Sequence, residues 1–190
     1  MAIQLIQPSA QYLDAYLETL AHGWSPSSFL KSAEPLQAEI DEVNANHVQF
    51  FKNNLNMTGG GEPIALPDGT SVERLPQITK WMWDGQFVGK IQFRWQHKTV
   101  ALPPTCLGHI GYGVVPWKRG QGYATKALEL LLQDIHYCGL PYVELITAAD
   151  NFISQRVIAR CAGKFVEDFE KLSANGGGPA KRFRIDLAQA

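Results

Sequence analysis

The chain has 190 residues, of which 45% are hydrophobic and 18% charged, and its 17 basic and 18 acidic residues give a formal net charge of -1. This length suits one domain with a sizeable core and is short for two. The balanced charge gives no electrostatic signature of binding to nucleic acid or to an anionic membrane, and no apolar stretch is long enough to span a bilayer. We therefore predict a single domain over residues 1–190 that binds neither nucleic acid nor a membrane.

The three cysteines, Cys106, Cys138 and Cys161, lie far apart and show no CxxC or Cys/His metal spacing. Dispersed thiols of odd number are typical of free cysteines in a reducing compartment. The first residues also lack the basic and apolar regions of a signal peptide. These features predict a cytoplasmic protein without disulfides or a metal site.

The first part of the chain reads as one strand and two helices. Residues 3–6 alternate between apolar and polar side chains, as in a strand, and apolar residues at helical spacing follow over residues 9–22 and 35–52. Residues 53–76 then shift to Asn, Gly, Pro, Asp and Thr. A connection of this length either has a function or is a plain surface excursion.

A hairpin is predicted next, because Asp84-Gly85 separates two strand-like runs, residues 78–83 and 86–95. The runs carry aromatic side chains that suit a sheet. They indicate core packing, with a ligand cage as the alternative. The four residues are Trp81, Trp83, Phe93 and Trp95.

The most informative stretch is HIGYGVVPWKRGQGYATKA, residues 109–127, which reads as a strand, a tight turn and a helix. The helical spacing predicts a helix over residues 119–138. Its start has two cations and two glycines but no capping Ser or Asp, and the first carboxylate comes at Glu129. Bare amides with nearby cations favour a bound anion such as a phosphate over the alternative of a basic turn that is merely solvated.

The remaining residues predict a strand at 142–148, a short helix after Asp150 and Asn151, and strands at 164–172 and 182–187. Neighbouring strands with helices between them indicate an α/β domain. We expect a mixed, largely antiparallel sheet of about six to seven strands with helices on both faces.

The six residues RGQGYA at 119–124 resemble the Arg/Gln-x-x-Gly-x-Gly/Ala motif of the GNAT superfamily of acyl-CoA-dependent N-acetyltransferases. The flanking HIGYGVVP and ATKALELLL are similar to that family's preceding strand and following helix. The resemblance covers about residues 81–187. It implies a GNAT-like fold in which the strands at 108–115 and 142–148 are parallel and splay apart, with residues 77–190 as the cofactor-binding core and residues 1–76 as a variable acceptor-side half.

The resemblance also implies the residues that bind acetyl-CoA. The backbone of Val114 and Val115 would hold the pantetheine arm, and Arg119 would orient the turn or add charge. Asn151 would contact the cofactor arm, although a helix cap explains it equally well. The amides implied for the pyrophosphate are those of Gly120, Gln121, Gly122, Tyr123, Ala124 and Thr125.

The chemistry requires the acceptor amine and the thioester to be positioned and a proton to be transferred. His109 and Glu144 are candidate bases, each with the alternative of a structural residue, and Tyr112 either bonds the acceptor or packs. Many family members carry a tyrosine acid in the helix after the Asn. The matching residue here is Ile158, so another group or water must serve.

We therefore predict transfer of an acetyl group from acetyl-CoA to a primary amine of a small molecule or peptide, by direct attack in a ternary complex. One alternative is a non-catalytic acyl-CoA sensor with a GNAT fold. Another is a phosphate-binding domain for a different nucleotide, which the absence of a GxGxxG or GxxxxGK[ST] motif disfavours. A homodimer is common in the family.

Overall fold

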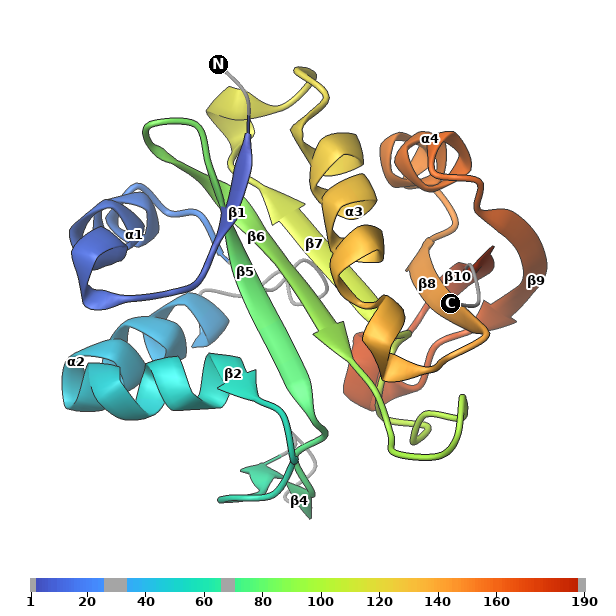
Figure 1. Cartoon of the computed structure of the whole chain (residues 1–190), viewed down its shortest axis with the longest axis horizontal. Helices are drawn as coiled ribbons and strands as arrows, with labels where there is room; N and C mark the ends of the chain where they lie inside the picture. Colours follow the sequence, from blue (N-terminus) through green and yellow to red (C-terminus); the bar gives the residue numbers. More distant parts are fainter. Residues whose placement is uncertain (1–2, 26–33, 66–70, 188–190) are drawn as a thin grey trace.

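The computed structural model describes residues 3–25, 34–65 and 71–187 and contains two main antiparallel sheets (Figure 1). The larger has the order β1 (Gln4–Ile6), β5 (Gln77–Trp83), β6 (Phe87–Arg94) and β7 (Ile110–Val114), and β2 (Leu55–Asn56) also pairs with β5. The smaller has the order β8 (Tyr142–Ala148), β10 (Pro179–Asp186) and β9 (Lys164–Glu170). The mixed α/β prediction is confirmed.

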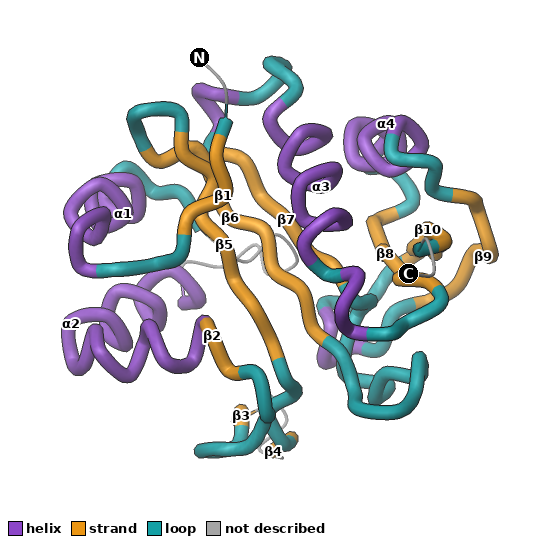
Figure 2. Tube along the Cα trace, viewed as in Figure 1, coloured by secondary structure: helices purple, strands orange, loops and turns teal. Residues whose placement is uncertain are grey.

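The helices cover both faces of the larger sheet. Helices α1 (Leu13–Ala21) and α2 (Glu34–Asn54) lie on one side of it, and α3 (Tyr123–Asp134) lies on the other (Figure 2). Helix α4 (Phe152–Arg160) follows β8 and contacts both that strand and α3. Helix α2 has a kink at Asn46, whose φ of -162° and ψ of 85° are not helical.

Two apolar clusters form the core, and the larger sheet separates them. One joins α3 to the sheet, and the other joins α1 and α2 to its opposite face. Trp81 is fully buried and stacks on Tyr16, with ring centroids 4.7 Å apart, while Phe93 stacks on Trp95 at 4.9 Å. Trp81, Phe93 and Trp95 therefore pack in the core, as expected from the core-packing interpretation rather than from a ligand cage.

Strands β7 and β8 meet near their starts and then separate into different sheets (Figure 1). The His109 amide donates to the Glu144 carbonyl at 2.7 Å. Beyond this point, β7 pairs with β6 and β8 pairs with β10. This is the splayed arrangement that the resemblance implies.

Two segments differ from the sequence-based expectation. Helix α3 begins at Tyr123 rather than 119, because Gly120 and Gly122 have φ of 77° and 82° and cannot continue a right-handed helix. It ends at Asp134 and continues as a 3₁₀ turn, His136–Cys138, up to Gly139.

The expected 53–76 loop contains β2 and the small pair β3 (Ile64–Ala65) and β4 (Ser71–Val72), while residues 66–70 of that loop lie outside the described residues. Within the described ranges, no helix is long and apolar enough to cross a membrane, and no cluster of metal-binding side chains is found. All three cysteines are free thiols.

Candidate active site

The turn before α3 combines backbone amides that lack hydrogen-bond partners within the described residues with open space beside its glycines. Gly122 is the N-cap of α3, no side chain caps it, and the first turn holds no acidic residue. A Cβ atom built on Gly120 or Gly122 would meet nothing within 4 Å. Among the residues that the structure describes, none bonds the amides of residues 120–125, and the first amide bonded is that of Lys126, which donates to the Gly122 carbonyl at 3.1 Å. This end of the helix suits an anion.

Side chains on both sides of this turn are anchored within the protein. Lys118 Nζ lies 3.0 Å from Asp84 Oδ2, and the Tyr123 hydroxyl donates to the same carboxylate oxygen. Arg119 Nε donates to the Val114 carbonyl at 3.1 Å. The predicted cofactor residues Arg119 and Tyr123 therefore use these side-chain groups to shape the turn.

The ladder between β6 and β7 decides which backbone groups face the gap beside β8. The Arg94 amide donates to the His109 carbonyl at 2.8 Å, and the Val115 amide donates to the Val88 carbonyl at 2.9 Å. Because antiparallel ladders alternate, the pair of Gly89 and Val114 is not hydrogen-bonded, and the Val114 amide points away from β6. The Val115 backbone, by contrast, is engaged at its amide.

His109 joins β7 to β8 through its side chain as well as its backbone. It is fully buried, and its Nδ1 accepts a hydrogen bond from the Glu144 amide at 3.0 Å. Burial lowers the pKa of His109 to about 4, despite the opposing effect of the Glu144 charge. The imidazole is therefore neutral at physiological pH and holds the two strands together.

This burial predicts an acid-dependent loss of stability. The pKa of His109 is about 4 in the folded chain and about 6.5 in an unfolded one. The unfolded state thus binds more protons between these values, and stability falls as the pH drops through this window. We expect His109→Gln to remove about 2 kcal/mol of the difference in unfolding free energy between about pH 7.5 and pH 4.5, measured by urea unfolding.

The matched control is His97→Gln, since His97 is exposed. It should keep the pH dependence of the wild type. If the His109 variant keeps the pH dependence of the wild type, burial does not lower the pKa of His109 in the folded chain.

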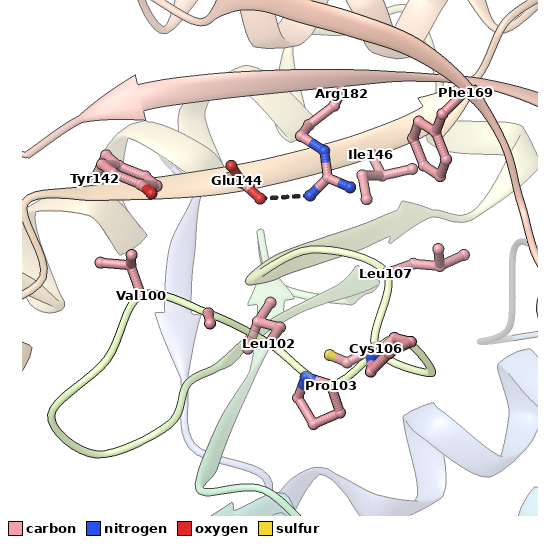
Figure 3. Close-up of a pocket in the computed structure, with 12 residues that line it drawn as sticks. Val100, Leu102, Pro103, Cys106, Leu107, Tyr142, Glu144, Ile146, Phe169 and Arg182 are labelled. Atoms are coloured by element: carbon pink, nitrogen blue, oxygen red, sulfur yellow. Dashed lines mark hydrogen bonds and ion pairs between the residues drawn. The ribbon is translucent and has the colours of Figure 1, made fainter.

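Glu144 is occupied by two arginines. Arg182 Nη1 donates to it at 2.6 Å and Arg184 Nη2 at 2.9 Å, and Figure 3 shows Arg182 beside it. Burial alone would raise the pKa of Glu144, but the hydrogen bonds from Arg184 and Arg182 outweigh it and lower the pKa. The carboxylate lines a pocket of about 330 Å³ between residues 100–107 and the smaller sheet. A carboxylate held in this way is a weak base.

Tyr112 reaches from β7 across to α4. Its hydroxyl lies 2.8 Å from Ser154 Oγ, and it lies 3.3 Å from the Ser154 carbonyl, to which it donates. Burial raises the pKa of Tyr112 to about 12, with the Ser154 hydrogen bond acting in the opposite direction. Tyr112 therefore carries its proton at physiological pH.

Asn151 is the N-cap of α4, where its Oδ1 accepts from the Ser154 amide at 3.0 Å. Asn151 therefore caps the helix, and this hydrogen bond uses its Oδ1 atom but not its Nδ2 group. Ile158, where many GNAT members have a tyrosine, is 1% exposed and packs in the larger apolar cluster.

Sequence reasoning missed two residues of this site. Ser154 belongs to no motif, and the sequence around Asp84 predicts only a turn. Asp84 lies 34 residues from Lys118 and 39 from Tyr123 along the chain, so no local pattern connects them.

Comparisons with known proteins agree with this geometry. The family model described as an acetyltransferase (GNAT) domain matches residues 71–164. A search of curated proteins finds no match. Solved structures match over nearly the full length, at identities that show the fold alone.

The microcin C7 self-immunity acetyltransferase MccE, solved in complex with acetyl-CoA and AMP, has a TM-score of 0.64 at 13% identity, covering 97% of this chain and 92% of that one. A putative ribosomal-protein-serine acetyltransferase from Vibrio cholerae has a TM-score of 0.59 at 16% identity, covering 97% and 93%. An acetyltransferase from Salmonella typhimurium that modifies the N-terminal serine of 50S ribosomal subunit protein L7/L12 has a TM-score of 0.62 at 13% identity, covering 99% and 96%. The family model thus assigns residues 71–164 to the GNAT acetyltransferase domain, and the solved structures share the fold of the chain.

Proposed function

We propose that this chain transfers an acetyl group from acetyl-CoA to a primary amine, by direct attack in a ternary complex. The observation that carries the proposal is the glycine turn at the start of α3, whose amides have no bond within the described residues and whose glycines border open space. The family match and the neighbour solved with acetyl-CoA support the choice of this ligand over another phosphate compound.

The residues around the turn fit the cofactor. The amides of residues 120–125 would hold the pyrophosphate, with the positive end of the α3 dipole behind them. The Val114 amide, which points away from β6, would bond the pantetheine arm along β7. We place this contact at Val114 rather than Val115, because the Val115 amide already donates to Val88.

Tyr112 is our candidate for the proton donor. When the amine attacks the thioester carbonyl, a C–N bond forms and the C–S bond breaks. The sulfur then needs a proton, and the amine must lose one to solvent. Tyr112 lies between β7 and α4 and carries its proton; it would turn its hydroxyl from Ser154 to the sulfur, protonate it and regain a proton from solvent. The neutral His109 accepts at Nδ1 and the ionised Glu144 has no proton to give, so neither suits a proton donor.

Replacing Tyr112 with phenylalanine is expected to lower kcat by about a hundredfold, the range typical of one general acid, while leaving CoA affinity unchanged. The measurement is thiol release under saturating acceptor, together with calorimetry of CoA. The control is Tyr137→Phe, because Tyr137 is 54% exposed at the far end of α3. An unchanged kcat would assign Tyr112 to packing against α4.

The function itself is tested by calorimetry of acetyl-CoA, ATP and NAD, followed by thiol-release assays with a panel of amines. The panel should hold small amines, amino acids, lysine peptides and a peptide beginning with serine, the last because two neighbours act, by their names, on ribosomal-protein serine. Binding of CoA with turnover of one amine supports the proposal. Binding without turnover of any amine favours the sensor alternative, and a preference for ATP or NAD overturns both.

A further inference from the structure

Asp84 lies in the tight turn between β5 and β6 and is 8% exposed. A buried carboxylate is costly unless it is paired and hydrogen-bonded. Burial alone would raise the pKa of Asp84, but hydrogen bonds from Tyr123 and Lys118 lower it. Asp84 is therefore ionised, and its negative charge is balanced by groups of the protein itself.

Its two side-chain partners flank the glycine turn. Lys118 ends the short 3₁₀ helix before the turn, and Tyr123 begins α3 after it. Both bond the same oxygen, Oδ2, with Lys118 Nζ at 3.0 Å. One carboxylate thus ties together the two ends of the segment that presents the free amides.

Little else holds the middle of that segment. Gly120 and Gly122 have no side chains, and no protein atom lies within 4 Å of where a Cβ would stand. Arg119 is held by two hydrogen bonds: its Nε donates to the Val114 carbonyl at 3.1 Å, and its amide donates to the Pro116 carbonyl at 3.3 Å. The spacing of the amides therefore depends on how Lys118 and Tyr123 are held at the two ends of the turn. Asp84 holds both of them.

We propose that Asp84 is a positioning residue for the pyrophosphate of CoA: it fixes residues 118 and 123 so that the amides between them converge on the anion. Asp84 itself contacts no part of the cofactor. The inference rests on the proposed function, because it assumes that CoA binds at this turn. Asp84 also neutralises Lys118, which leaves the amides as the principal anion ligands of the turn.

The test compares two ligands that differ in the pyrophosphate. CoA contains it, whereas pantetheine lacks the whole nucleotide. We expect Asp84→Asn and Asp84→Ala to lower CoA affinity about tenfold or more, the effect of losing one charge-assisted hydrogen bond. The affinity for pantetheine, measured by NMR titration, should stay unchanged. A variant that had lost its structure would bind pantetheine more weakly as well.

The matched control is Asp186→Asn, which removes a 62% exposed carboxylate paired with Lys164 at 2.7 Å. It should bind both ligands as the wild type does. If the Asp84 variants fail to fold, Tyr123→Phe and Lys118→Met each remove one of the two contacts and should show the same selective loss of CoA affinity.

Three results would overturn the inference. Unchanged CoA affinity in folded Asp84 variants would refute it while leaving the proposed function intact. Increased CoA affinity would show that Asp84 acts by screening Lys118 from the anion. If the wild type binds no CoA, the proposed function fails and this inference fails with it.

Discussion

Replacing Gly122 with glutamate is expected to lower the affinity for CoA at least about a hundredfold, because it puts a carboxylate where the amides of residues 120–125 are free for a phosphate. A Cβ atom at this position meets no protein atom within 4 Å, so the first side-chain atom enters open space. Its φ of 82° costs about 1 kcal/mol. A carboxylate at a helix start recovers about 0.5 kcal/mol of this. The variant should therefore fold and bind poorly, as measured by calorimetry beside thermal unfolding.

The control for this change is Gly122→Ala, which carries the same backbone strain without the charge. We expect it to lose much less affinity than the glutamate variant. Equal affinity of wild type and glutamate variant would place the pyrophosphate elsewhere, and equal loss in both variants would assign the effect to backbone strain rather than charge.

Replacing Gly89 with alanine is expected to cost about 3 kcal/mol of unfolding free energy, the upper end of the usual range for a group forced into a filled space. A Cβ at Gly89 would lie 2.1 Å from the Gly113 carbonyl oxygen and 3.0 Å from the Val114 Cα atom. Both contacts are with the backbone of β7, so no side chain can rotate away. The two strands must separate or shift.

The comparison variant is Gly139→Ala, whose φ of 65° is also left-handed but whose Cβ would meet nothing within 4 Å. It should cost only about 1 kcal/mol. Urea unfolding measures both. Because Val114 borders the gap between the sheets, the Gly89 variant should also bind CoA more weakly than the Gly139 variant. Similar free energies for the two would mean that β6 and β7 accommodate the methyl group.

The elements that could be predicted are those with local signals. The Asp84-Gly85 turn, the strand before Pro116 and the glycine turn before α3 are each defined by residues adjacent in the sequence, whose φ preferences and hydrogen-bonding groups act over a few positions. The helix start is the main local error. The left-handed conformation of Gly120 and Gly122 keeps residues 119–122 out of the helix, so α3 starts at Tyr123.

The sequence could not decide among the candidate catalytic residues. His109 and Glu144 are strand residues with suitable chemistry, and the sequence cannot tell that one is buried and that the other binds arginines 38 and 40 residues away. Tyr112 had no stronger signal than either, yet its hydroxyl crosses to a helix 42 residues later. Long-range partners set the pKa and exposure of these groups, and those partners meet only after the sheets assemble.

The amino-acid sequence by itself therefore determined the class of fold, the glycine turn and the position of the candidate anion-binding helix end, because glycine conformation and helix dipoles are local properties. The tertiary structure alone decided that β7 and β8 separate after His109, that Val114 rather than Val115 faces the gap, and that Asp84 ties the two ends of the turn. These features depend on strand pairing and burial between residues distant in the chain, where a carboxylate, an imidazole or an amide takes its role from the group opposite it.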